Sequence, residues 1–262
     1  MALLNSFNSG VAGIKTFSKS LEVIGDNIAN VNSTGFKTSR VTNQDSFIET
    51  MRPPTAANGN AGGLNGMQVG MGSSVASISQ KFTQGALTTT AGPTDLGISG
   101  NGFFKVTDSN QNTFYTRAGD FRLDELGTLR TNGGMLVAGA DEGAFLNAKS
   151  FSFEKDGTIN VYKEGSATPV PGGTLELVSF ANPNGLKREG QNLFSNIALA
   201  AGDETPVPAG SSNIIQGTLE LSNVDLTQEF SDLIVAQRAF QANSRVITVS
   251  DSVMDEVVNL KR

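Results

Sequence analysis

The stretch from Val224 to Arg262 constrains the fold of this chain more than any other. Apolar side chains recur there at alternating spacings of three and four, which predicts a helix of about five heptads with one apolar seam. The seam residues are Leu226, Phe230, Leu233, Phe240, Ile247, Met254 and Val258. Polar Gln237, Ser244 and Asp251 interrupt a second heptad register, and Ser222, Asn223 and Asp225 are candidate N-caps. A seam this long is not expected to be stable without a partner.

A second helix with the same pattern is predicted from Leu3 to Val31. Its apolar stripe comprises Leu4, Phe7, Val11, Ile14, Phe17, Leu21, Ile24, Ile28 and Val31. The helix is expected to end near Asn32, with Gly35 as a left-handed C-cap. One such helix would be an ordinary surface helix, but two at opposite ends favour pairing with each other and with copies in neighbouring subunits.

The composition argues against several classes of function. The chain contains no cysteine, no histidine and no tryptophan, so the commonest general base and the usual thiolate and imidazole metal ligands are missing. Its formal net charge is -6, and basic residues are scattered, which makes nucleic acid an unexpected partner. There is no apolar run long enough to insert into a membrane and no secretory signal pattern. We therefore expect no enzyme activity, cofactor or metal site.

Between the helices the pattern changes twice. Residues 36–93 include a stretch rich in Gly, Asn and Ala, which predicts an extended or flexible linker. Residues 94–221 contain short β-prone runs separated by turn residues, which predicts one β-rich domain. Within it, Phe151 to Tyr162 is expected to form a hairpin with a type I′ turn at Asp156 and Gly157. The predicted fold class is thus α+β, with long N- and C-terminal helices that form a coiled coil and flank a central mainly-β domain.

Candidate chemical motifs in the centre are weak. Asp108, Asn110 and Asn112 have the spacing that opens a calcium loop, but Thr113 replaces the required glycine, so a polar turn is expected. Neighbouring carboxylates occur at Asp124-Glu125 and Asp141-Glu142, in turn contexts typical of solvated loops.

Three sequence blocks carry a resemblance to a known family. The stretch from Leu21 to Lys37 (LEVIGDNIANVNSTGFK) resembles the N-terminal signature of the bacterial flagellar rod and hook proteins. Their C-terminal signature resembles SNVDL and IVAQRAFQ, which begin at Ser222 and Ile234. DLGISGNGFF from Asp95 and YTRAG from Tyr115 resemble their central domain. Within the family, GMQVGMG from Gly66, together with Gln84-Gly85, resembles the distal rod proteins.

This resemblance implies a structural subunit of the flagellar basal body, exported through the flagellar channel and assembled into a helical tube that transmits torque. It implies homo-oligomer contacts and contacts with other rod, hook and ring proteins. The organisation it implies is helix 1–35, linker 36–93, β domain 94–221 and helix 222–262. The predicted assembly residues are the seam residues with four polar side chains: Phe7, Val11, Ile14, Leu21, Ile24, Asn27, Ile28, Asn30, Phe230, Leu233, Gln237, Arg238, Phe240, Ile247, Met254 and Val258.

Two alternatives remain at this point. The nearer is a hook protein of the same family, although hook proteins usually carry an additional outer domain for which this chain has no room. The more distant is an enzyme or sugar-binding β domain with helical tails, which would require a cleft with converging carboxylates.

Overall fold

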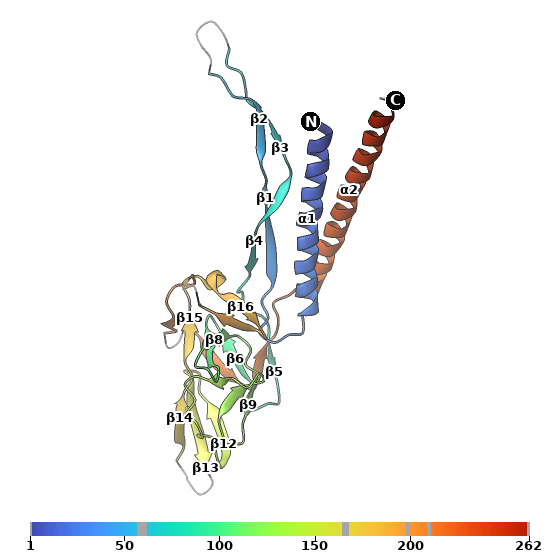
Figure 1. The fold of residues 1–262 in the computed structure, drawn as a ribbon. Helices are drawn as coiled ribbons and strands as arrows, with labels where there is room; N and C mark the ends of the chain where they lie inside the picture. Colours follow the sequence, from blue (N-terminus) through green and yellow to red (C-terminus); the bar gives the residue numbers. More distant parts are fainter. Residues whose placement is uncertain (1, 57–61, 164–167, 198–199, 209–210, 261–262) are drawn as a thin grey trace. The chain divides into compact units, whose positions relative to one another are not determined.

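The computed structural model describes residues 2–56, 62–163, 168–197, 200–208 and 211–260, in two compact units (Figure 1). Unit 1 comprises Met1–Ile28, Ser39–Ser79 and Asp225–Arg262, and unit 2 comprises Ala29–Thr38 and Gln80–Val224. Residues 57–61 of the predicted linker and 261–262 of the predicted C-terminal helix lie outside the described residues. A helix at each end and strands between them give the predicted α+β class.

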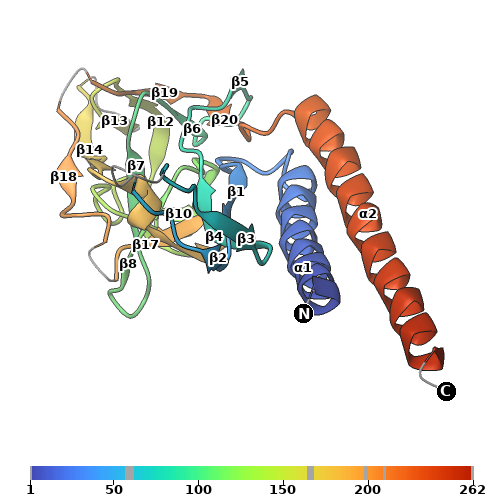
Figure 2. The same ribbon diagram turned by 90° about the horizontal axis from the view of Figure 1, so that it is seen from above.

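Unit 1 contains both helices, α1 (Ala2–Ala29) and α2 (Leu226–Asn259). They lie side by side and run in opposite directions, with both chain termini at the same end (Figures 1 and 2). Asp225 is the N-cap of α2, and its carboxylate accepts the backbone N–H groups of Thr227 and Gln228 at 2.9 and 3.4 Å. Within the described residues, neither helix is long and apolar enough to cross a bilayer.

The end of α1 differs from the prediction. The helix stops at Ala29, and Gly35 lies six residues further along the chain in unit 2, not at a helix C-cap. Its φ of +68° is left-handed, and an added Cβ would lie 2.6 Å from the Ala118 nitrogen. Glycine is required there because the chain both turns and passes against another backbone segment.

Unit 1 also contains four strands in the segment predicted as a linker. β1 (Ser39–Asp45) pairs with β4 (Ser73–Gln80), and β2 (Ile48–Arg52) pairs antiparallel with β3 (Met67–Gly70). The Thr16 hydroxyl of α1 lies 3.2 Å from the Ser73 carbonyl at the start of β4. The residues of β2 and β3 are all exposed.

Unit 2 is built from strands, the largest group being a nine-stranded sheet among the described residues. Its path runs β16 (Lys187–Gly190), β17 (Leu193–Ser195), β8 (Thr113–Thr116), β7 (Phe103–Thr107), β11 (Leu136–Val137), β10 (Leu129–Thr131) and β9 (Phe121–Leu123), with β15 (Leu177–Ser179) pairing with β7 and with β18 (Thr205–Pro206). Smaller sheets are β12 (Ala148–Phe153), β13 (Thr158–Lys163) and β14 (Val170–Thr174), then β6 (Leu96–Ser99) with β19 (Asn213–Gln216), and β5 (Leu87–Thr89) with β20 (Thr218–Glu220). One 3-10 turn covers Pro183–Gly185.

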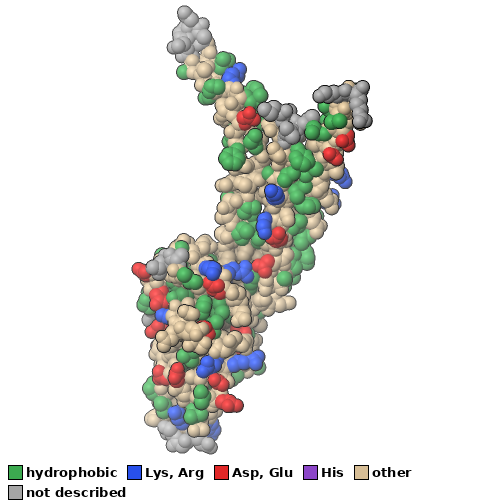
Figure 3. Space-filling model, viewed as in Figure 1, with side chains coloured by type: hydrophobic (Ala, Val, Ile, Leu, Met, Phe, Trp, Pro, Cys, Tyr) green, Lys and Arg blue, Asp and Glu red, His purple; other side chains and the backbone are tan. Residues whose placement is uncertain are grey.

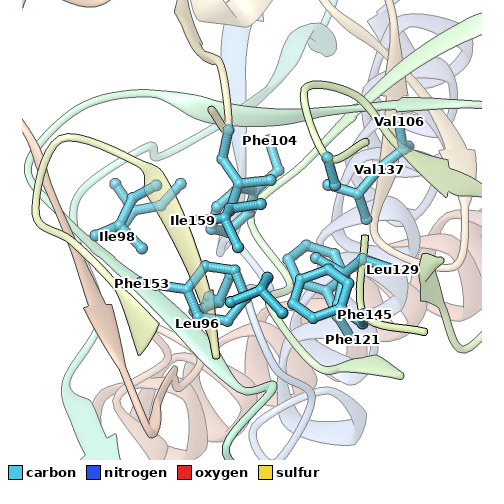
Figure 4. Close-up of a cluster of buried hydrophobic side chains, with 14 of the residues drawn as sticks. Leu96, Ile98, Phe104, Val106, Phe121, Leu129, Val137, Phe145, Phe153 and Ile159 are labelled. Atoms are coloured by element: carbon cyan, nitrogen blue, oxygen red, sulfur yellow. The ribbon is translucent and has the colours of Figure 1, made fainter. Parts of the chain in front are cut away.

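The core of unit 2 lies where these sheets meet. Leu96 and Ile98 of β6, Phe104 of β7 and Ile159 of β13 point into one cluster and are almost fully buried (Figure 4). The rings of Phe104 and Phe121 pack edge to face with centroids 5.1 Å apart. Burying side chains of this size stabilises the unit by about 1.5–3 kcal/mol each.

The β12–β13 hairpin forms as predicted, but its turn type is not I′. Gly157 N–H donates to the Glu154 carbonyl at 3.0 Å, and Glu154 N–H donates to the Thr158 carbonyl at 2.9 Å. Only Gly157, with φ +93°, is left-handed, whereas a type I′ turn would also require positive φ at Asp156. The loop is therefore a type I turn closed by a glycine bulge, which suits hairpins with one more loop residue.

Candidate functional site

Lys37 of the N-terminal block and Arg117 of the central block meet Glu220, which lies just before the C-terminal block, in one buried ionic cluster of unit 2. Glu220 accepts from two cations at once, the Lys37 ammonium at 2.6 Å and the Arg117 guanidinium at 3.1 Å. The side chains of Lys37 and Glu220 are fully buried, and that of Arg117 is 3% exposed. We call Lys37, Arg117 and Glu220 the ion cluster.

Each member of the ion cluster is held by further bonds. Lys37 Nζ donates to the Thr83 carbonyl at 2.9 Å, and Arg117 donates to the Gly100 carbonyl at 2.8 Å while its guanidinium lies 5.6 Å from the centre of the Phe103 ring. Glu220 Oε1 also accepts the Gly85 backbone N–H at 2.8 Å. These bonds offset the large cost of burying the charges.

Burial dominates the electrostatics of the ion cluster. It lowers the pKa values of Lys37 and Arg117, and the nearby Glu220 carboxylate opposes that lowering in both cases. One carboxylate faces two cations, so the loss of Glu220 would leave two buried positive charges with no counter-charge.

Asn223, next to the start of α2, joins the same region. Its side-chain oxygen accepts from the backbone N–H and the hydroxyl of Thr38 at 2.8 and 2.6 Å. Its amide group donates to the carbonyls of Lys81 and Thr83 at 2.7 and 3.1 Å. One asparagine thus ties the C-terminal signature to two other segments.

Gln84 and Gly85 also contact the segments around the ion cluster. The Gln84 side chain donates to the Ile98 carbonyl at 3.2 Å and accepts the Gly100 N–H at 3.1 Å. A Cβ added at Gly85 would lie 2.0 Å from the Leu221 carbonyl oxygen, so only glycine fits.

The predicted assembly residues do not include Glu220, Arg117 or Asn223. The sequence does single out Glu220, because it is a charged residue between Leu219 and Leu221 in a β-prone run. A charged side chain buried in such a run is almost always paired. The partner could not have been named, since Lys37 is 183 residues away along the chain.

The contact between α1 and α2 depends on small residues. A Cβ added at Gly10 would lie 3.2 Å from Ile247 Cγ1, and one added at Gly13 would lie 2.8 Å from Asn243 Nδ2. On α2, the least exposed residues are Glu229, Ala236 and Ser250, which are buried. Together with Asn243 they form a heptad register one residue earlier than the predicted polar register of Gln237, Ser244 and Asp251. Glu229 bonds to Asn27 of α1 and Asn243 lies beside Gly13, so this register faces α1.

The predicted assembly residues range from buried to exposed in the structure. Asn27 is buried, and the half-buried group comprises Val11, Ile14, Leu21, Ile24, Ile28, Asn30, Leu233, Phe240 and Ile247. The exposed group comprises Phe7, Phe230, Gln237, Arg238, Met254 and Val258. Figure 3 shows hydrophobic side chains on the surface of the helices.

Asn27 joins three elements of unit 1. Its amide group donates to the Ser39 carbonyl at 2.9 Å and to Glu229 Oε1 at 3.1 Å, and its oxygen accepts the Ser39 N–H at 2.9 Å. Burial raises the pKa of Glu229, and the charges of Asp232 and Asp225 raise it further, against the opposing effect of the Asn27 bond. The end of α1, the start of β1 and the first turn of α2 are therefore linked by one polar contact.

This raised pKa predicts a pH dependence for unit 1. Because Glu229 binds its proton more tightly in the folded chain, the stability of unit 1 should rise as pH falls from neutral through the raised pKa toward the unfolded value of about 4.3. In Glu229→Gln that contribution disappears, since glutamine does not titrate but can still accept from Asn27. Urea titrations followed by the helical circular dichroism signal between pH 7 and 4 should show that the stability of the wild type increases relative to that of the variant as the pH falls. A constant difference between the two proteins would contradict this.

Two glycines of α1 should respond oppositely to alanine. At Gly25 an added Cβ meets nothing within 4 Å, so Gly25→Ala should stabilise the helix by about 1 kcal/mol. Gly13→Ala has the same gain in helix propensity but presses on Asn243, so it should stabilise less or destabilise. Urea midpoints of the helical signal measure both, and Gly13→Ala in an Asn243→Ala background should recover the gain. Equal effects at both glycines would refute the close contact.

A groove of about 940 Å³ in unit 2 is the candidate for a catalytic or sugar-binding cleft. Its lining includes the carboxylates Glu189, Asp203 and Glu204. Bonds from Lys187 and Ser195 lower the pKa of Glu189, and bonds from Lys105 and Tyr115 lower that of Glu204. A glycosidase acid needs a raised pKa, so these paired carboxylates do not suit that chemistry.

Comparison with known proteins gives consistent matches along the chain. Three family models match: "Flagella basal body rod protein" over residues 7–37, "Flagellar hook protein FlgE/F/G D1 domain" over 97–161, and "Flagellar basal body rod FlgEFG protein C-terminal" over 215–260. The chain is 43% identical to the flagellar basal-body rod protein FlgG of Bacillus subtilis, over 99% of this chain and 100% of that protein. It is 33% identical to FlgG of Buchnera aphidicola from Acyrthosiphon pisum, over 95% and 96%. It is also 45% identical to the flagellar hook protein FlgE of Treponema pallidum, but over 52% of this chain and 30% of that protein.

Proposed function

The chain belongs to the family of flagellar basal-body rod proteins, and we propose that, as a structural subunit of the distal rod, it builds a helical tube through its two terminal helices. Its place is the flagellar basal body. In the tube, α1 and α2 form coiled-coil layers with the helices of neighbouring copies.

The observation that carries this proposal is the apolar surface that remains on α2 after α1 has packed against it. Phe230, Ile234, Val249 and Val257 are each at least half exposed, at 50%, 52%, 60% and 52%. They lie outside the register that faces α1, and helices of soluble proteins rarely leave this much apolar surface uncovered. A second helix from a neighbouring copy would cover it.

A tube requires contacts between different surfaces of identical subunits. Such heterologous contacts propagate along a screw when the rotation does not close into a ring. The polar residues Asn30, Gln237 and Arg238 would fix the register between copies, because a polar group paired in only one alignment disfavours the others.

Within the family, a rod subunit is favoured over the hook alternative. The chain matches whole FlgG relatives from end to end, whereas the matched part of the Treponema hook protein is 30% of that protein. The stretch from Gly66 to Gly72 and the pair Gln84-Gly85 support the same choice. We further infer contacts with other rod, hook and ring proteins, and export through the flagellar channel.

Electron microscopy of fibres assembled from the purified full-length chain tests this proposal. A distal rod subunit should give straight, rigid tubes, whose number should rise with protein concentration. Curved, bendable tubes would instead favour a hook subunit. A protein that stays monomeric at high concentration, with both helices already protected from hydrogen exchange, would contradict tube assembly altogether.

A further inference from the structure

The ion cluster joins residues that are far apart in the chain. Lys37 and Glu220 are separated by 183 positions, and Arg117 and Glu220 by 103. Residue 37 precedes β1 by two positions, and residue 220 precedes the N-cap of α2 by five. The cluster therefore lies where the chain enters and leaves unit 2 at its two ends.

Three backbone N–H groups near the ion cluster bond across the segments around residues 35, 85–86 and 220–221. Gly35 N–H donates to the Glu220 carbonyl at 2.8 Å, and Leu221 N–H donates to the Ala86 carbonyl at 2.9 Å. Gly85 N–H donates to the Glu220 carboxylate itself. All three bonds require the C-terminal segment, and the bond from Gly35 requires the N-terminal segment as well.

The tip of the β16–β17 hairpin holds the N-terminal segment from a further side. Gln191 and Asn192 both have left-handed backbone angles, with φ of 51° and 59°. Asn192 donates from its side chain to the Thr34 carbonyl at 2.8 Å and accepts the Thr116 hydroxyl at 2.9 Å. Two successive non-glycine residues in this region are strained, and this strain persists only where neighbouring contacts hold it.

We propose that the ion cluster is a closure latch, which makes the segments around residues 35–38, 83–86, 116–118 and 218–223 close as one unit, and only when both ends of the chain are in place. If the segment with Glu220 is missing, Lys37 and Arg117 both lose their carboxylate partner, and if any other segment is missing, at least one member of the ion cluster loses a hydrogen-bond partner. A buried unpaired charge costs far more than the pair contributes, so partly closed states are disfavoured. The inference concerns the folding of unit 2 and does not depend on tube assembly.

The latch makes a prediction about the unmodified protein. Native-state hydrogen exchange of the full-length chain, below its assembly concentration, should show the amides of Gly35, Gly85 and Leu221 opening together. Their opening free energies and their urea dependences should be equal, as expected for one cooperative segment. The amide of Val106, in the core strand β7, should open at higher cost. Different urea dependences for the three amides would overturn the latch.

Substitution of one member should affect all segments. Lys37→Met removes one of the two cations that pair with Glu220 and the donor to the Thr83 carbonyl, so protection at Gly85 and Leu221 should fall by about a hundredfold or more, and by the same factor at both. The matched control is Lys105→Met, which breaks the Lys105–Glu204 pair of 2.8 Å in a partly exposed part of the same unit. It should change protection at these amides by less than about threefold. A loss confined to residues 35–38 in Lys37→Met would refute the latch.

A third variant separates charge pairing from packing. In Lys37→Met, Arg117→Met, Glu220→Met combined, no buried charge remains unpaired, and apolar residues of similar volume fill the site. Protection at Gly35 and Leu221 should return to within about tenfold of wild type. A triple variant less protected than Lys37→Met alone would show that packing, not charge completeness, holds the segments, and would overturn the proposal.

Discussion

Ile247→Asp should abolish fibre assembly. Ile247 is half-buried, with Cγ1 3.2 Å from the position a Cβ would take on Gly10, so the substitution places a carboxylate in the α1–α2 contact. Burying that charge without a partner costs several kcal/mol, and about 3 kcal/mol would raise the critical concentration for assembly by a factor of more than one hundred. Sedimentation of fibres over a concentration series measures it, and motility of cells carrying the variant provides a second readout.

The matched control for that experiment is Ile247→Leu, which keeps the volume and apolar character and should assemble within a few-fold of wild type. Phe240→Asp, one heptad earlier, should behave like Ile247→Asp, because it belongs to the same half-buried register. If either aspartate variant builds fibres at the wild-type concentration and supports motility, the helices are not the assembly seam.

Gly119→Ala should destabilise unit 2 by about 3 kcal/mol or more. An added Cβ would lie at bonding distance from the backbone oxygen of Leu96, 1.7 Å away, and Leu96 is fully buried in the core. The Gly119 carbonyl also accepts the Leu96 N–H at 2.9 Å, so the two segments cannot separate without losing a bond. Urea unfolding followed by near-ultraviolet circular dichroism of the two tyrosines reports it.

Gly134→Ala provides the comparison for this prediction. Gly134 has a φ of +84° but open space around an added Cβ, so its cost is the backbone conformation alone, about 1–2 kcal/mol. Gly119 does not have a left-handed φ, so its cost is the contact alone. Equal losses of stability at the two positions would show that the contact at Gly119 relaxes freely.

Local patterns predicted the helices and most strands well, because they depend on neighbours in the chain. The apolar spacing around Phe240 and Ile247 placed α2, and the carboxylate of Asp225 capped it as expected. The turn at Asp156 and Gly157 was wrong, although the hairpin was right. A single residue of extra loop length changes the turn type, and loop length depends on where the strand pairing ends.

The sequence alone did not predict which residues of α2 face α1. Gln237 was expected in the seam of α2 as a contact between subunits, and the structure buries Ala236 and places Asn243 against Gly13, both one register earlier. Periodicity defines a stripe on a helix but not which part of a wide stripe the partner covers. That choice depends on the small residues Gly10 and Gly13 of the other helix, which allow close approach.

The sequence by itself determined the α+β class, the long helix at each end and, through its three signature blocks, the family. Only the tertiary structure decided that Lys37, Arg117 and Glu220 meet in one buried cluster and that Gly35 serves that junction and not a helix end. The physical reason is that helices and turns are selected by interactions over a few residues. An ion pair between residues 183 positions apart forms only when the whole unit folds, and no periodic pattern in the sequence indicates which residues it will join.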